Sequence, residues 1–339
     1  MSKTIGFKFV WGVTKSIGGT ERRMIEACRH LVANGHSVTS IHNCAESNLF
    51  IESMESAGAR VHYSKSPIKI LYFITTIPGE INWHFGSRAG VPLRFIRMLG
   101  LVNKVWSAQN GLDRSGNYFE KLIDRKTGRW VDLVIANSNS AAIHAREKYK
   151  NRVEVVTAIS ALGDLWQNTQ IPDRNHDHVL TVGIVGNNRP EKNHKFAIEV
   201  LSVLKEKIDF ELRIFTNSGG EIQADLEKCD LTSQSEVIAG HVLTPEDYQS
   251  LDLLLHTSLS ESLPMVLLEA RSQGCFVLSS PVGDSAIYAT HICDSLIANE
   301  WVRVIEAIER DRKRNTLPDK VKYVSVNNYV DLLISLARK

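Results

Sequence analysis

The chain has 339 residues, 43% of them hydrophobic and 23% charged, which is ordinary for a globular α/β protein with room for two domains. The formal net charge of +2 gives no case for a nucleic-acid-binding protein, so any anion site has to be local. Five scattered cysteines without C-x-x-C spacing indicate neither a disulfide framework nor a zinc site. Without a signal peptide or a long apolar run, we expect a cytoplasmic protein.

The first half alternates predicted strands with predicted helices. The run "TIGFKFVW" predicts a strand, and after a glycine loop Met24, Cys28 and Leu31 recur at helical spacing until Gly35. The apolar runs "INWHF", "KVWSA" and "DLVIAN" predict further strands. This alternation predicts a parallel sheet covered by helices.

Residues 163–178, "GDLWQNTQIPDRNHDH", are polar, carry Pro172 and lack periodicity, so we interpret them as an interdomain linker. The strand and helix pattern then restarts with "VLTVGIVG" and continues through "FELRIFT", "SEVIAG", "DLLLHTS" and "CFVLSS". We therefore predict an N-terminal domain over 1–163 and a C-terminal domain over 174–321.

Ligands of doubly wound sheets bind beyond the carboxyl ends of the strands, and three features fall there. Gly18 and Gly19 precede a predicted helix N-terminus that suits an anion, although a tight turn packed for steric reasons explains them as well. Next, "VGNNRPEKN" holds Arg189 and Lys192, which either neutralise a diphosphate or serve as solvated surface charges.

The third feature is a pair of glutamates around Pro264. If a helix begins there, Glu269 lies about 7.5 Å further along its axis, while Glu261 precedes it in a loop. A diphosphate would repel carboxylates, so their useful partners are hydroxyl groups of a ribose or a sugar. The alternative is a solvated helix residue at Glu269 and a helix-dipole partner at Glu261.

The segments "GGTERRMIEACRHLVANGHSV", "VGNNRPEKN" and "SLSESLPMVLLEARSQGCFVLSSPVGD", in this order, resemble the retaining GT-B glycosyltransferases of family 4. The resemblance extends to about residue 290. It implies two Rossmann-like domains, each with a doubly wound parallel sheet, that face a central cleft. It also implies a C-terminal helix, about 322–339, that returns to the first domain.

The resemblance assigns roles residue by residue. Glu261 matches the glutamate that contacts donor-sugar hydroxyls, Glu269 the one that holds the ribose, and Lys192 the lysine that binds the diphosphate. Arg189 and the helix N-termini would also stabilise negative charge on the leaving diphosphate. Further donor contacts are implied at Gly18, Gly19, His241, Val242, Leu263 and Met265.

Two positions depart from the family pattern. Asn187 stands where the family commonly has an arginine, so we take Arg189 as its candidate replacement. Asn110 in "SAQNGLD" stands where the family often has a histidine. His84 in "NWHFG" matches another family histidine, and a packed core histidine remains the alternative.

The implied activity is metal-independent transfer of a sugar from a UDP- or GDP-linked donor, as substrate and without a cofactor, to a glycan or lipid-linked acceptor. Assembly of a surface polysaccharide or glycolipid is the expected context. Two alternatives stay open: a nucleotide-sugar epimerase or phosphorylase on the same fold, and a catalytically silent nucleotide-sugar-binding subunit.

Residues 87–106, "SRAGVPLRFIRMLGLVNKVW", interleave basic and apolar side chains. Arg94 and Arg97 on such a segment could contact an anionic membrane while the apolar side chains enter its boundary. The alternative is a helix that covers the sheet, with its apolar residues in the core and its arginines in solvent. Both interpretations remain open from the sequence.

Overall fold

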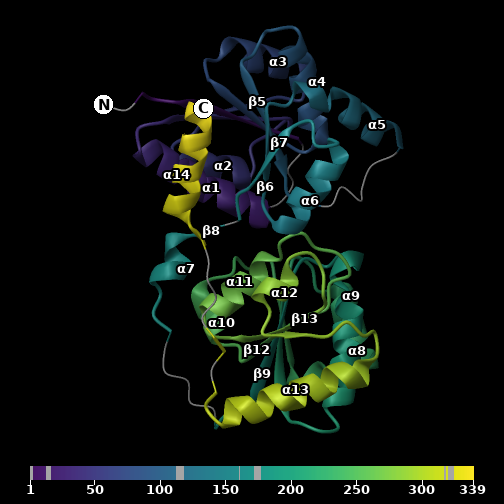
Figure 1. The fold of residues 1–339 in the computed structure, drawn as a ribbon. Helices are drawn as coiled ribbons and strands as arrows, with labels where there is room; N and C mark the ends of the chain where they lie inside the picture. Colours follow the sequence, from purple (N-terminus) through teal and green to yellow (C-terminus); the bar gives the residue numbers. More distant parts are fainter. Residues whose placement is uncertain are drawn as a thin grey trace. The chain divides into compact units, whose positions relative to one another are not determined.

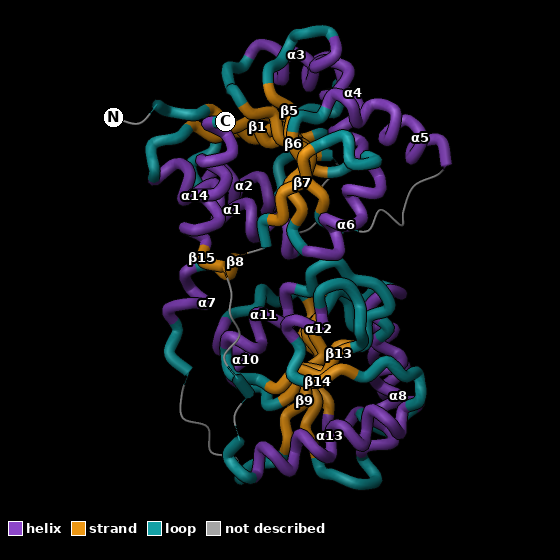
Figure 2. The backbone as a smooth tube through the Cα atoms, viewed as in Figure 1, coloured by secondary structure: helices purple, strands orange, loops and turns teal. Residues whose placement is uncertain are grey.

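The computed structural model describes residues 3–12, 17–111, 118–159, 161–171, 177–316, 318–319 and 324–339. The chain divides into two compact units, which we call unit 1 and unit 2 (Figure 1). Unit 1 consists of Met1–Gly163 together with Val324–Lys339, and unit 2 consists of Asp164–Tyr323. In each unit a parallel sheet lies among helices (Figure 2).

Unit 1 contains a sheet of seven parallel strands, which is buried because helices cover both faces. In spatial order the strands are β3 (Arg60–Tyr63), β2 (Ser37–His42), β1 (Gly6–Trp11), β4 (Ile81–Phe85), β5 (Lys104–Gln109), β6 (Leu133–Ala136) and β7 (Glu154–Thr157). The helices are α1 (Gly19–Ala33), α2 (Leu49–Ser56), α3 (Pro67–Thr76), α4 (Ser87–Met98), α5 (Tyr118–Thr127), the 3-10 helix η1 (Gly128–Trp130), α6 (Asn139–Lys148) and α14 (Val326–Arg338).

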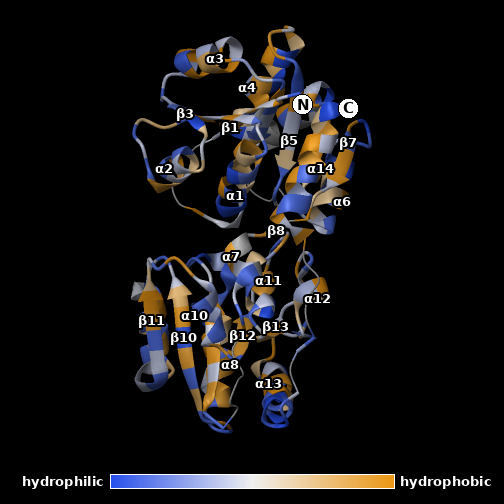
Figure 3. Ribbon diagram, turned by 90° about the vertical axis from the view of Figure 1, so that its left-hand side faces the viewer, coloured by the Kyte–Doolittle hydropathy of each residue, from blue (hydrophilic) through white to orange (hydrophobic). Residues whose placement is uncertain are grey.

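Unit 2 repeats this plan with six parallel strands. In spatial order they are β11 (Ser235–Ala239), β10 (Phe210–Thr216), β9 (Leu180–Val185), β12 (Leu253–His256), β13 (Phe276–Ser279) and β14 (His291–Ile292). The helices are α7 (Asp164–Asn168), η2 (Pro190–Lys192), α8 (His194–Leu204), α9 (Gly220–Lys228), η3 (Thr232–Gln234), α10 (Pro245–Gln249), α11 (Met265–Ser272), α12 (Ser285–Tyr288) and α13 (Ala298–Lys313). Figure 3 shows hydrophobic colour along much of β10 and β11, interrupted by hydrophilic residues.

The strand orders confirm the predicted α/β architecture with two doubly wound parallel sheets. The strand order reverses once in each sheet, between β1 and β4 in unit 1 and between β9 and β12 in unit 2. The loops that follow the two strands at such a reversal lead to opposite faces of the sheet, which leaves room for a ligand between them. We therefore expect the candidate sites at the carboxyl ends of β1 and β4 and of β9 and β12.

Helix α14 belongs to the core of unit 1, although it comes last in the chain. Its Val330 and Leu333 are fully buried in the same cluster as Met24 and Leu31 of α1. Just before it, β15 (Val324–Ser325) pairs in parallel with β8 (Ala161–Leu162). The apolar face of α14 is thus covered by α1 and the core of unit 1.

The structure corrects the interpretation of 163–178 as an irregular linker. Residues Asp164–Asn168 form helix α7, and Gln273 of unit 2 donates a hydrogen bond to the carbonyl of Trp166 at 3.1 Å. Pro172 and the rest of 172–176 lie outside the described residues.

The structure also corrects the view of Arg94 as an exposed cation. Its side chain is fully buried in α4 and forms an ion pair with Asp124, because the surrounding helices enclose it. Arg97, about one-third exposed, pairs with Asp132 at 3.1 Å. Leu93 and Ile96 are core residues, whereas Leu99 is 66% exposed. In the described part of the chain, no helix combines the length and apolar character needed to span a membrane.

Candidate functional site

Two loops meet at the reversal of the sheet in unit 2. One follows β9 and carries η2, and the other follows β12 and leads into α11. The backbone N–H of Leu259 donates to the carbonyl of Glu191 at 2.8 Å, and the Thr257 hydroxyl donates to the carbonyl of Asn193 at 3.0 Å. These bonds hold the loops of Lys192 and Glu261 together.

Lys192 and Glu261 form a direct ion pair in this place. The Lys192 ammonium lies 2.5 Å from Glu261 Oε1, with the two side chains 21% and 16% exposed. The Ser258 hydroxyl donates to the same oxygen at 3.3 Å, and His256 Nε2 lies 3.7 Å from it. The site thus presents one cation and one carboxylate, both partly accessible and both fixed by neighbours.

The charge on Glu261 is strongly stabilised. Burial by itself raises the pKa of this carboxyl, but the His256 imidazole and the Lys192 ammonium outweigh burial and lower the pKa to about 2. Burial lowers the pKa of His256, and its Nδ1 forms a hydrogen bond of 2.9 Å with the Ser279 hydroxyl. Glu261 is therefore a carboxylate that accepts hydrogen bonds.

We expect Glu261 to make the stability of the protein depend on pH. Its folded pKa of about 2 lies below the ordinary value of 4.5, so its stabilising contribution is complete above pH 4.5 and is lost as the pH falls through 2. Urea denaturation of the wild type and Glu261→Gln should give a difference in free energy of unfolding that shrinks as the pH falls from about 4.5 to about 2. A difference that stays constant over this range would contradict the ion pair.

Gly283 fixes the loop that carries Glu261. Its φ of +57° lies in the left-handed region, and a Cβ there would come within 2.4 Å of the Ser262 carbonyl oxygen and 2.6 Å of that of Glu261. The N–H of Asp284 donates to the Ser262 carbonyl at 2.9 Å. Only glycine allows the loop of Gly283 to approach the loop of Glu261 this closely.

Glu269 lies on α11 and is 5% exposed. The Tyr248 hydroxyl of α10 donates to Glu269 Oε2 at 2.7 Å. This bond fixes the carboxylate in the middle of α11, which rules out the alternative of a freely solvated helix residue. Leu263 is buried and Met265 is half-buried beside the N-terminus of the same helix.

Arg189 and Asn187 lie in the loop before η2. Arg189 is 57% exposed and forms an ion pair of 3.9 Å with the exposed Glu191, so it lies at the surface. Asn187 is half-buried. Of the two cations predicted in this loop, the structure places Lys192 alone against Glu261.

His241 and Val242 follow β11, where Gly240 has a φ of +73°. His241 Nε2 lies 2.8 Å from Asp247 Oδ2, and its ring packs at a tilt on Phe215. Val242 is 67% exposed. The backbone of this loop is therefore accessible and anchored to α10.

The predicted residues of unit 1 surround the reversal between β1 and β4. Gly18 caps α1 and donates its N–H to Glu21 Oε2 at 3.0 Å, so a carboxylate already lies at the helix start, where Gly19 is half-buried. Asn110 accepts a hydrogen bond from Arg23 at 2.9 Å. A cavity of about 240 Å³ is lined by Trp11, Gly12, Thr20, Glu21, Phe85, Gly86 and Asn110.

His84 is a packed core residue. It is 2% exposed, and burial lowers its pKa to about 3, helped by the charge of Arg94. Neither ring nitrogen has a hydrogen-bond partner among the described residues. The structure therefore favours the interpretation of His84 as a packed core histidine.

Sequence reasoning missed several residues of these sites. His256 is the last residue of β12 and Ser258 lies two residues further on, a spacing that places both on one side of an extended chain shortly before Glu261. Arg23 and Glu21 lie in the first turns of the helix after Gly19. The signal for Gly283 was weaker, because its role depends on a contact between distant loops.

Part of unit 2 matches a known family model, and part of the chain is similar to a known glycosyltransferase. Residues 178–310 match the family model described as Glycosyl transferases group 1. Over 141 residues the chain is 28% identical to a capsular polysaccharide biosynthesis glycosyltransferase, CapH, of Staphylococcus aureus. That match covers 38% of this chain and 39% of the relative.

Solved structures resemble the whole chain. A glycosyltransferase from Rickettsia africae is similar with a TM-score of 0.78 and 16% identity, covering 99% of this chain and 98% of that one. Alr3699/HepE from Anabaena, solved in complex with UDP, has a TM-score of 0.78 and 12% identity, covering 98% and 95%. The chain thus has the GT-B fold, and its second unit carries the sequence pattern of Glycosyl transferases group 1 over residues 178–310.

Proposed function

We propose that the protein is a retaining, metal-independent glycosyltransferase that moves a sugar from a nucleotide-sugar donor to a glycan or lipid-linked acceptor. The observation that carries the proposal is the Lys192–Glu261 pair at the reversal of the second sheet. The match of this unit to Glycosyl transferases group 1 supports it, as does the likeness to CapH. Assembly of a surface polysaccharide or glycolipid is the proposed context.

In this proposal the ion pair opens when donor binds. The diphosphate takes over Lys192, whose ammonium then stabilises the negative charge that develops on the leaving group. Glu261, ionised and already aligned by Ser258, accepts hydrogen bonds from the donor-sugar hydroxyls. The two side chains thus exchange one partner for another without leaving a buried charge unpaired.

A thermal-shift panel of UDP, GDP, ADP and their sugars tests the proposal. A ligand at 100 times its dissociation constant stabilises the folded state by roughly 2.7 kcal/mol, which is readily measured. The structure of HepE with UDP makes uridine nucleotides the first to try. Stabilisation by none of them would contradict the proposal, and tight binding without transfer to any acceptor would favour a silent binding subunit.

We expect Glu269→Ala to weaken nucleoside-diphosphate binding by about 10-fold to 100-fold, because charge-assisted bonds to the ribose are worth about 1.5–3 kcal/mol. Tyr248→Phe is the matched control, since it removes the hydroxyl that bonds Glu269 but keeps the carboxylate. Calorimetric titration measures the nucleoside-diphosphate affinity of both variants. Affinity of Glu269→Ala within about twofold of wild type would show that this carboxylate has a structural role alone.

A further inference from the structure

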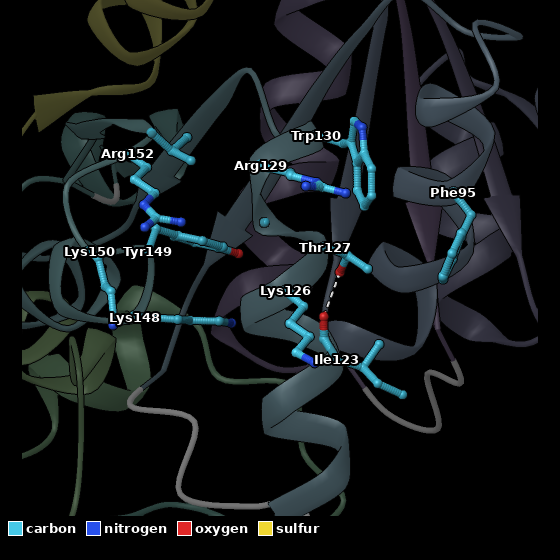
Figure 4. Close-up of a pocket in the computed structure, with 12 residues that line it drawn as sticks. Phe95, Ile123, Lys126, Thr127, Arg129, Trp130, Lys148, Tyr149, Lys150 and Arg152 are labelled. Carbon is cyan, nitrogen blue, oxygen red and sulfur yellow. Dashed lines mark hydrogen bonds between the residues drawn. The ribbon is translucent and has the colours of Figure 1, made fainter.

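A second cavity lies in unit 1, away from the predicted site residues. It has a volume of about 540 Å³, within the range of small-molecule sites. Among the described residues that line it, five are cations and none is an aspartate or a glutamate. The lining consists of Phe95, Ile123, Lys126, Thr127, Gly128, Arg129, Trp130, Lys148, Tyr149, Lys150, Arg152 and Val153, which we call the basic pocket (Figure 4).

The basic pocket is formed by segments that precede strands. Residues 126–130 come just before β6, and residues 148–153 come just before β7. In a parallel sheet the starts of the strands share one edge, so the pocket lies at the amino edge. Asn110 and the smaller cavity follow strands and lie at the carboxyl edge. The basic pocket is therefore distinct from the site around Asn110.

Aromatic rings give the pocket fixed walls. Tyr149 is 4% exposed, and its ring packs so closely on Gly128 that a Cβ there would lie 2.4 Å from it. The Arg129 guanidinium stacks 4.2 Å from the centre of the Trp130 ring. Figure 4 shows Lys148, Tyr149, Lys150 and Arg152 on one side and Lys126, Arg129 and Trp130 on the other.

The positive charge exceeds what the surroundings neutralise. Lys148 pairs with Asp124, which Arg94 also contacts. Among the described residues, Lys126, Arg129, Lys150 and Arg152 have no ion pair to a carboxylate. Helices α4, α5 and α6 end nearby, and each C-terminus contributes about −0.5 charge, about −1.5 together. Four cations then leave a surplus of about two to three positive charges.

That surplus selects the chemistry of the ligand. A single carboxylate brings one negative charge and would leave most of the surplus unpaired, whereas a phosphate monoester brings about −1.5 to −2 and three acceptor oxygens. Two arginines can bind such oxygens bidentately, and the lysines can approach as point charges. A phosphate group therefore fits the pocket better than a carboxylate.

We propose that the basic pocket binds a ligand with a phosphate monoester, whether the headgroup of a lipid or a free phosphorylated molecule. Phe95, 44% exposed, lines its rim, and Met98 and Leu99 follow it on the exposed end of α4. These apolar side chains would suit a lipid surface. The cations that reach the phosphate would then come from this pocket rather than from the buried Arg94.

Fluorine NMR of protein labelled with 5-fluorotryptophan tests the proposal with inorganic pyrophosphate as the probe. The Trp130 resonance, assigned with Trp130→Phe, reports the pocket even if pyrophosphate also binds near Lys192 in unit 2. We expect it to shift in the wild type, with affinity on the order of 100-fold weaker in Lys126→Gln/Lys150→Gln/Arg152→Gln. The charge-matched control Arg60→Gln/Lys65→Gln/Lys69→Gln, on exposed residues of the same unit, should titrate like the wild type.

A second measurement needs no variant. Pyrophosphate should protect Lys126 and Lys150 from acetylation in the wild type, while Lys65 and Lys69 stay reactive. The proposal is wrong if neither pyrophosphate nor anionic vesicles shift the Trp130 resonance or protect Lys126 and Lys150. Equal weakening of pyrophosphate binding in the control variant would also overturn it. Vesicles of phosphatidylcholine with and without phosphatidic acid, whose headgroup is a phosphate monoester, distinguish the sources. Pocket-dependent sedimentation with the phosphatidic acid vesicles alone identifies a headgroup, and its absence beside pyrophosphate binding identifies a free ligand.

Discussion

Lys192→Ala should lower kcat by about 100-fold to 1,000-fold, because the developing charge on the leaving diphosphate would lose its nearest cation. Nucleoside-diphosphate affinity should fall as well. Steady-state kinetics on the donor identified by the thermal-shift panel, with calorimetric titration of the nucleotide, measures both effects. Lys195→Ala, an exposed lysine three residues further on, is the matched control and should keep wild-type values.

Removal of Lys192 also leaves the Glu261 carboxylate without its partner, so Lys192→Ala has to be compared with a variant of Glu261. Glu261→Gln should slow turnover but spare nucleoside-diphosphate affinity, and the double variant should bind nucleotide as poorly as Lys192→Ala. If Glu261→Gln weakened the bare nucleotide as much as Lys192→Ala does, the two side chains would have to act as one unit. Arg189→Ala, if it left the kinetics unchanged, would show that Arg189 does not replace the family arginine absent at Asn187.

Gly283→Ala should lower the free energy of unfolding of unit 2 by about 3 kcal/mol or more. The left-handed backbone accounts for about 1–2 kcal/mol, and the rest comes from a Cβ that would lie 2.4 Å from the Ser262 carbonyl oxygen. Relief of that clash has to displace the loop of Glu261, so turnover should fall too. Denaturant unfolding and kinetics on the same preparation check the two effects.

Gly240→Ala separates backbone strain from the clash. Gly240 also has a positive φ, +73°, but a Cβ there would meet nothing within 4 Å. Its cost should therefore stay at about 1–2 kcal/mol. Equal destabilisation by the two substitutions would show that the contact between Gly283 and the Glu261 loop is not tight.

The sequence alone determined which segments form the sheets and where the charged loops fall. Buried strands such as β1 and β9 are rich in apolar residues, and α1 shows helical spacing, because local periodicity records which side of an element is buried. The loops with Lys192 and Glu261 follow such strands directly. Parallel pairing then brings their carboxyl ends to one edge of a sheet, so both loops could be predicted to lie at a ligand-binding edge.

Only the tertiary structure decided which charges are accessible. Arg94 and Arg97 look alike in the sequence, yet Arg94 is enclosed with Asp124 while Arg97 reaches solvent. The basic pocket could not be predicted, since its cations come from segments before two different strands and each segment by itself looks like a solvated helix end. Charge accumulates there through contacts between residues far apart in the chain, and local periodicity carries no information about such contacts.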